Sequence, residues 1–172
     1  MPAPRRPGGA FALRNCDAFF THGSRRSAEE TAQRVREVKA EAARYGREID
    51  VYTVGVITCR PTQQESEDYY RHCIVDHADW SAVDLILAKK NISRETVGDA
   101  MFNEQRTNYA NGMGGVPIVG DPDCVARQLA DLSQAGLRGV GVSFVNYADE
   151  LPFFCDEVIP RLERMGVRER RK

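Results

Sequence analysis

Several features that would mark a particular class of protein are missing from this sequence of 172 residues. No apolar run approaches the roughly 20 residues that a membrane-spanning helix requires. The formal net charge of −1 provides no excess positive charge for nucleic acid or an acidic membrane surface. The five cysteines are scattered and form no CxxC pair, which is typical of free thiols in a reducing compartment. We therefore predict a cytoplasmic protein that binds neither nucleic acid nor membrane.

The short motifs of nucleotide binding and nucleophilic catalysis are missing as well. The sequence contains neither GxxxxGK(S/T) nor GxSxG. The glycines of residues 139–144, GVGVSF, lie inside a predicted strand, and the third glycine of a dinucleotide loop is absent, so they indicate close backbone packing. His72, Cys73, Asp76 and His77 suggest metal ligands, but two histidines five residues apart should not share a helical face. We predict no metal site.

Apolar periodicity and capping signals divide the chain into alternating strands and helices. Strands are predicted at residues 17–21, 49–58 and 137–144. Helices are predicted at residues 10–14, 27–46, 62–77, 81–90, 93–108, 121–136 and 148–165, with a glycine-rich loop at 109–115. Ser27 and Thr62 each begin a capping box, and Asp121 is an N-cap that precedes Pro122 in the first turn. Pro160 is expected to kink the last helix.

This order of elements is typical of a parallel sheet with helical crossovers. The three predicted strands are few, because a flavodoxin-like sheet has about five strands. A TIM barrel has eight strands in about 250 residues. The chain is therefore either a small α/β fold or part of a larger barrel.

The residues that follow the predicted strands are the candidate site residues, because parallel α/β folds place their sites at the carboxyl ends of strands. His22 is either a proton donor or stabiliser of an oxygen intermediate, or a hydrogen-bonding loop residue. Arg60 either contacts an anion or caps the following loop as a surface charge. Ser143 lies at the end of the third predicted strand, and Asn146 and Tyr147 either bond a ligand or serve turn chemistry and packing. Spacing alone supports no nucleophile–base pair, so the catalytic residues stay unknown.

Two long segments resemble the C-terminal half of the bacterial-luciferase-like flavin monooxygenases, which include the alkanesulfonate, dimethylsulfone and pyrimidine monooxygenases. The first is residues 11–66, which contain DAFFTHG and IDVYTVGVITCRPT. The second is residues 114–167, which contain VPIVGDPDCV and LRGVGVSFVNYADE. A helical stretch of matching length and character separates them. The ordered combination carries the resemblance, which covers almost the whole chain after Gly8.

The resemblance implies that residues 9–167 are about the last three βα units of a TIM barrel, with residues 80–116 as an insertion that forms a lid. Residues 1–8 are then an irregular start, and residues 168–172 a basic tail. Members of the family bind reduced FMN supplied by a separate flavin reductase, and they activate O₂ to oxidise a small organic substrate. We expect the same cofactor and reductase here, in a homo- or hetero-oligomer.

The sequence also departs from the family. The first five strands, which carry most flavin contacts in the relatives, have no counterpart in it. Gly8 is what remains of a phosphate-binding segment before the first helix, and it is the one candidate cofactor residue. Val54 and Val56 stand where alkanesulfonate monooxygenases carry an arginine and a histidine. Asn146 and Tyr147 occupy the position of substrate-mouth residues.

We therefore expect a fragment or subunit of a reduced-flavin-dependent monooxygenase. Two alternatives stay open from the sequence: a non-catalytic partner or scaffold subunit, and a truncated, inactive paralogue.

Overall fold

The computed structural model describes residues 7–21, 28–112 and 114–170. Within them a parallel sheet contains β1 (Ala18–Phe20), β2 (Asp50–Cys59), β3 (Val116–Gly120) and β4 (Gly139–Ser143). The α-helices are α1 (Pro7–Asn15), α2 (Ala28–Ala43), α3 (Gln63–Tyr70), α4 (Trp80–Lys89), α5 (Arg94–Val97), α6 (Asp99–Ala110), α7 (Pro122–Gln134), α8 (Tyr147–Phe153) and α9 (Ile159–Arg164). Two π-helical segments are η1 (Arg71–Asp76) and η2 (Phe154–Val158).

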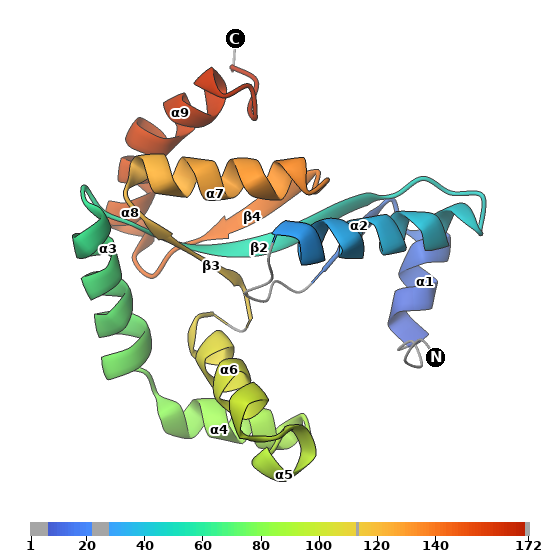
Figure 1. Ribbon diagram of the computed structural model, residues 1–172, viewed down its shortest axis with the longest axis horizontal. Coiled ribbons are helices and arrows are strands. Elements are labelled where there is room, and N and C mark those ends of the chain that lie inside the picture. The colour runs from blue at the N-terminus through green and yellow to red at the C-terminus, as the bar shows by residue number, and fades with distance from the viewer. Residues whose placement is uncertain (1–6, 22–27, 113, 171–172) are drawn as a thin grey trace.

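β2 is the longest strand and pairs with all three others (Figure 1). β1 pairs with its start and β3 with its end. β3 and β4 both pair with Gly55 and Val56, so they lie on opposite edges of β2.

Backbone hydrogen bonds place β1 on the same edge as β3. The Tyr52 carbonyl accepts from the Thr21 N–H just after β1, whereas the Val51 carbonyl accepts from the Arg138 N–H just before β4. Adjacent carbonyls of a strand point to opposite edges of the sheet. The edge of β2 opposite β4 is therefore shared by β1 at its start and β3 at its end.

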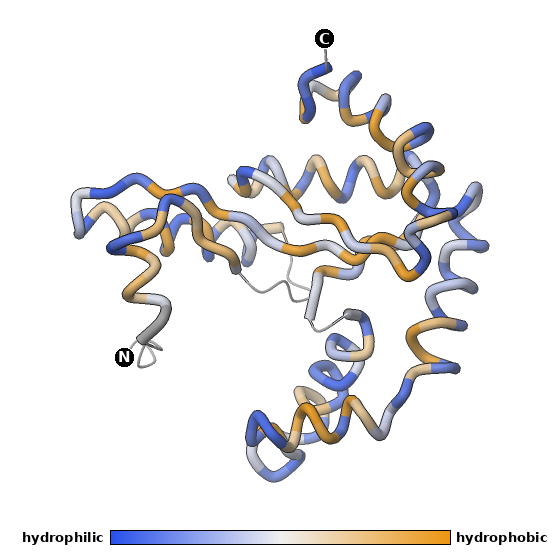
Figure 2. Tube along the Cα trace, turned by 180° about the vertical axis from the view of Figure 1, so that it is seen from behind, coloured by the Kyte–Doolittle hydropathy of each residue, from blue (hydrophilic) through white to orange (hydrophobic). Residues whose placement is uncertain are grey.

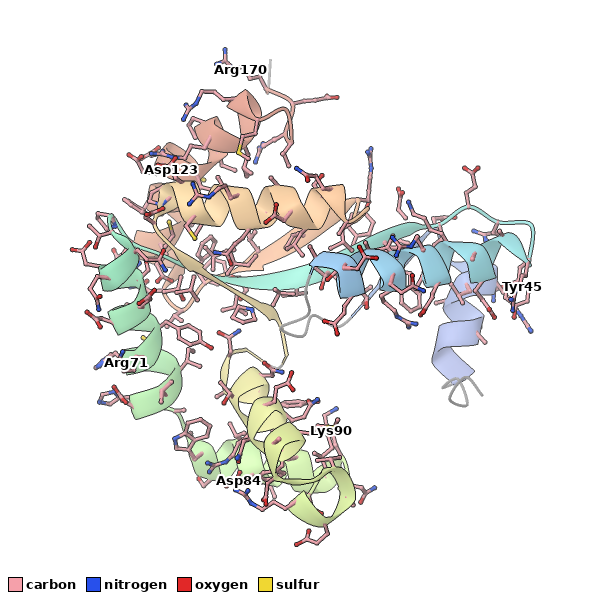
Figure 3. All side chains as sticks on the ribbon, viewed as in Figure 1. Tyr45, Arg71, Asp84, Lys90, Asp123 and Arg170 are labelled. Carbon is pink, nitrogen blue, oxygen red and sulfur yellow. The ribbon has the colours of Figure 1, made fainter. Side chains whose placement is uncertain are left out.

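Helices cover one face of the sheet, which we call the helix-covered face. At the start of β2, Val51 packs in a cluster with Val35, Val38 and Ala42 of α2. At the end of β2, the core contains Ile57 and Cys59 with Val125, Ala126 and Leu129 of α7, Phe154 and Val158 of η2, and Leu162 of α9. Asp123 of α7, labelled in Figure 3, accepts from Arg161 of α9 at 2.7 Å and joins these helices. Figure 2 shows hydrophobic residues concentrated along the strands and also within α4.

The other face, which we call the open face, is exposed over the first half of β2. Phe20 is 59% exposed and Val54 36% exposed. Phe20 and Tyr52 stack with ring centroids 5.9 Å apart. Only toward the end of the strand is the open face covered, because Gly112 and Gly115 lie against Val56 there. Parallel sheets are normally covered on both faces, so this face is unusual.

Helices α4, α5 and α6 form a separate hairpin that lies away from the sheet in Figure 1. α4 and α5 pack chiefly on α6, which in turn contacts η1. Arg106 donates to both carboxylate oxygens of Asp84 at 2.7 and 2.9 Å and lies over the Trp80 ring at 4.4 Å. Figure 3 labels Asp84 on this hairpin. These interactions are within the hairpin, so they stabilise it independently of the sheet.

The prediction of three strands was incomplete, because residues 116–120, between the predicted loop at 109–115 and the cap at Asp121, form β3. Its valine and isoleucine residues favour a strand, but the strand is short, and Pro117 is disfavoured in a strand except at an edge. It forms because the long β2 extends beyond β1 and leaves its edge free for pairing from Gly55 to Cys59.

Three helix predictions also need correction. The irregular start predicted for residues 1–8 is wrong for Pro7 and Gly8, which belong to α1, since proline is tolerated in a first helical turn. The predicted helix at 93–108 is divided by Gly98, whose φ of +82° separates α5 from α6. The last predicted helix is divided by η2, because Pro160 lacks the N–H that a regular turn would donate.

The expectation that His72 and His77 point apart was wrong. Both lie in or beside η1, and their ring centroids are 4.1 Å apart. A π-helix bonds residue i to residue i+5, so residues five apart fall on the same side. Even so, the part of the chain that the structure describes contains no group of three or more His, Cys, Asp or Glu arranged to hold a metal ion.

No helix among the described residues is long and apolar enough to cross a membrane.

Candidate functional site

The carboxyl ends of β2, β3 and β4 meet at one edge of the sheet, where polar side chains from several elements converge. We call this group the strand-end cluster. It consists of Arg60, Ser66, Tyr69, Ser143, Asn146, Tyr147 and Glu150.

Ser66 joins the ends of β2 and β3 to α3. Thr62 and Glu65 form the predicted capping box at the start of α3, and this places Ser66 one turn into the helix. Its fully buried hydroxyl accepts from the Arg60 N–H at 2.9 Å. The same hydroxyl lies 2.8 Å from the Gly120 carbonyl, which accepts its proton. A buried hydroxyl with both donor and acceptor capacity used fixes the neighbouring strand ends.

Arg60 joins the end of β2 to α3 and α8. Its guanidinium donates to Glu150 Oε1 at 2.8 Å and to the Cys59 carbonyl at 3.1 Å. It also lies over the Tyr69 ring, 3.7 Å from the centroid. The Glu150 side chain is only 2% exposed, whereas that of Arg60 is 25% exposed. The pair is therefore mostly shielded from water, where removing one partner is costly.

The turn after β4 is held by its own cap. The Asn146 side chain accepts from the Ala148 N–H at 3.1 Å, and the Asn146 N–H donates to Glu150 Oε2 at 2.8 Å. The Tyr147 hydroxyl donates to Ser143 Oγ at 3.3 Å. Tyr147 is 52% exposed, so this turn presents its hydroxyl and ring to solvent.

The surroundings raise the pKa values of two weak acids in this region further above neutrality. Burial, followed by the negative charge of Asp121, raises the pKa of the Cys59 thiol to about 12. Burial, a hydrogen bond with Cys73 and the charge of Glu150 raise the pKa of Tyr69. At neutral pH Cys59 is therefore a thiol and an unsuitable nucleophile.

The structure brings together four of the predicted site residues: Arg60, Ser143, Asn146 and Tyr147. His22 lies outside the described residues. Gly8 lies in the first turn of α1, whose N-terminal end is far from α3 and α8 in Figure 1.

Sequence reasoning missed Ser66, Tyr69 and Glu150. For Glu150 a signal was available, because it is spaced four residues from Phe154 and eight from Val158, both of which are buried. A carboxylate on the buried stripe of a helix indicates a partner in the core.

Parallel strands with one helix-covered face and polar side chains at their carboxyl ends define an α/β protein that would bind ligands at that edge. The sequence model of the luciferase-like monooxygenase family matches residues 5–139, so the chain belongs to this family. The family resemblance predicted from the sequence is thus confirmed.

Individual relatives cover the chain almost completely. The FMNH2-dependent dimethylsulfone monooxygenase of Pseudomonas fluorescens (strain Pf0-1) is 24% identical over 164 residues, which are 92% of this chain and 44% of the relative. Among solved structures, DmoA from Hyphomicrobium sulfonivorans matches with a TM-score of 0.75 and 18% identity, over 95% of this chain and 40% of that one. EDTA monooxygenase (EmoA) from Chelativorans sp. BNC1 matches with a TM-score of 0.71 and 22% identity, over 93% of this chain and 42% of that one.

The structural likeness at these identities establishes a shared fold. The chain spans less than half of the length of these relatives.

Proposed function

We propose that this chain is the C-terminal part of a TIM barrel that catalyses reduced-flavin-dependent monooxygenation of a small organic substrate. The observation that carries the proposal is the sheet with one helix-covered face and one open face, in a chain of the luciferase-like monooxygenase family. In this view β1, β2 and β4 are the last three barrel strands, and the open face is the barrel interior. Residues 80–116 are the insertion that acts as a lid.

The side chains of the open face support only part of a flavin site. Phe20, Tyr52 and Val54 offer an apolar and aromatic surface on which a flat ring could pack. Within the described strands, however, the open-face positions of β1, β2 and β4 carry no Arg, Lys or His that could pair with a phosphate. A Cβ added to Gly9, in the first turn of α1, would meet no atom of the described residues within 4 Å, so these residues form no close contact there.

The described residues therefore do not form a complete FMN site. The remaining contacts must come from barrel strands supplied by another segment or chain, and we derive no catalytic step from the residues present.

What these residues can do is shape the substrate side of the site. Ser143, Asn146 and Tyr147 supply hydroxyl and amide groups at the mouth, and Arg60 and Glu150 hold this turn against β2. We propose His22 as a further mouth residue, and Gly8 as a remnant of the phosphate segment. A flavin reductase would supply FMNH2, in a homo- or hetero-oligomer. The five free cysteines suit a cytoplasmic location.

A second candidate function is that of a non-catalytic partner subunit. The incomplete flavin site favours it, because a chain whose described open-face positions offer no phosphate contact can still add this face to a related barrel. A truncated, inactive paralogue would share the same features.

Flavin binding with and without completion tests the proposal. FMN fluorescence is titrated with the purified chain alone, and then with the chain mixed with the part of a family relative that it does not align with. We expect saturable quenching at micromolar concentration only in the mixture. Quenching by the chain alone would show that no completion is needed, and no quenching in either case would contradict the flavin role.

A matched pair of variants makes the test specific. Val54→Arg places a charge on the open face, and Gln134→Arg places one at the exposed end of α7. Binding in the mixture should be lost in the first variant and kept in the second. Turnover of a substrate by the mixture would then separate an enzyme from a non-catalytic partner.

A further inference from the structure

We propose that Glu150 is a positioning residue, which holds Arg60 and the turn between β4 and α8 in the arrangement that the site requires. The description of this turn as a substrate mouth rests on the proposed function, but the positioning itself does not.

The geometry shows a carboxylate shared between two elements. Glu150 Oε1 accepts from the Arg60 guanidinium at 2.8 Å, at the end of β2. Glu150 Oε2 accepts from the Asn146 N–H, also at 2.8 Å, in the turn after β4. Both distances are typical of strong, charge-assisted hydrogen bonds. One side chain therefore connects the ends of two neighbouring strands.

Burial makes this connection selective for a carboxylate. The Glu150 side chain is 2% exposed, so an unsatisfied polar atom there could not turn to water. Both of its partners are donors, and a glutamine offers only one acceptor oxygen while its NH₂ group would face a second donor. An aspartate keeps both acceptors but is one methylene shorter.

The same contact gives Arg60 a role that differs from anion binding. Its charge is balanced by Glu150, and its plane lies on the Tyr69 ring of α3. Arg60 thus spans from α8 to α3, the helix that continues into η1 and the α4–α6 hairpin. Neutralising Glu150 would loosen the turn and leave the guanidinium over Tyr69 without its counter-charge.

The test compares Glu150→Gln with Asp149→Asn in the full chain. Asp149 is the neighbouring carboxylate, exposed, and accepts from the Asn146 side chain at 2.7 Å. Hydrogen exchange of the Asn146 N–H is followed by NMR. We expect exchange to be about tenfold faster in Glu150→Gln, as for the loss of one hydrogen bond to a charged group. It should be unchanged in Asp149→Asn.

A second readout follows Tyr69 by NMR of isotope-labelled tyrosine. Glu150 is one of the groups that raise the Tyr69 pKa, and Arg60 lowers it. Glu150→Gln should therefore lower the pKa of Tyr69, because it removes the negative charge and leaves the positive one unbalanced. In Glu150→Asp, which keeps the charge, the pKa of Tyr69 should stay close to its wild-type value. Exchange of the Asn146 N–H should still be partly accelerated.

Wild-type exchange at Asn146 together with wild-type titration of Tyr69 in Glu150→Gln would overturn the proposal. If Glu150→Gln fails to fold, Glu150→Asp and Arg60→Lys provide the same two readouts; Asn146 exchange like the wild type in Glu150→Asp would then contradict it. None of these measurements uses flavin or turnover. The failure of this proposal is thus distinct from the failure of the proposed function.

Discussion

Cys59 illustrates how a single buried side chain at the end of β2 constrains the chemistry of the site. It is 4% exposed and lies in the core cluster with Ile57 and Ile118. Desolvation penalises its thiolate, and the nearby charge of Asp121 adds to this penalty. A cysteine beside candidate site residues is therefore a packing residue, which the sequence alone did not distinguish from a reactive one.

Cys59 should also make the protein less stable in alkali. An unfolded cysteine titrates near 9.0, whereas Cys59 in the folded chain has a pKa of about 12. As pH rises through this window the unfolded chain loses a proton that the folded chain keeps, so the free energy of unfolding falls; below 9.0 the full stability is present. Urea unfolding measured below and above pH 9.0 should show that the free energy of unfolding declines as pH rises. This decline should be smaller in Cys59→Val.

The control for this experiment is Cys155→Val, since Cys155 is exposed. It should retain the decline of the wild type. An equal decline in Cys59→Val and the wild type would show that Cys59 does not titrate differently in the two states.

At the scale of elements, the sequence predicted what local signals determine. The β-branched run of β2 and the cap formed by Asp121 and Pro122 were predicted and are present, with Asp121 accepting from the Cys124 N–H at 2.7 Å. β3 was not predicted, because Pro117 interrupts its β-branched residues and because the free edge of β2, with which it pairs, is not visible in the sequence. The contact of Arg60 with Glu150 joins residues 90 positions apart, and no periodicity reveals it.

The α4–α6 hairpin should unfold before the sheet, because its packing is mostly internal. Its Trp80 is the single tryptophan of the chain and lies under Arg106. In urea, tryptophan fluorescence should therefore change at a lower concentration than the far-ultraviolet circular dichroism. Arg106→Gln should move the fluorescence transition to a still lower urea concentration. The free energy of unfolding of the hairpin should fall by less than about 1 kcal/mol, since the pair with Asp84 is partly exposed.

Arg127→Gln, on the exposed side of α7, is the matched control and should leave the fluorescence transition in place. Coincident transitions in the wild type would show instead that the hairpin and the sheet unfold as one unit.

At the scale of the whole molecule, the contrast between the two faces of the sheet is the main physical fact. Helices α2, α7 and α9 bury the helix-covered face, while Phe20 and Val54 remain exposed on the other. An exposed apolar surface on a parallel sheet indicates an interaction site or a tendency to aggregate. Among the described strands β4 pairs only with β2, so its other edge adds unpaired backbone groups to the exposed surface of the sheet.

The open face should therefore determine how the isolated chain behaves in solution. Phe20→Ser together with Val54→Thr replaces its two exposed apolar side chains with polar ones, and should reduce self-association and binding of a hydrophobic dye such as ANS. Thermal stability should change little, because Phe20 is 59% and Val54 36% exposed.

A matched double variant, Leu85→Ser with Met101→Thr, changes exposed apolar residues of the hairpin, 57% and 51% exposed. If light scattering and dye binding fall equally in both, the open face is not the associating surface. The other outcome is that only the first double variant reduces light scattering and dye binding, and that it also loses flavin binding in the completed mixture. The open face would then be both the surface through which the isolated chain associates and the surface that binds the rest of the barrel.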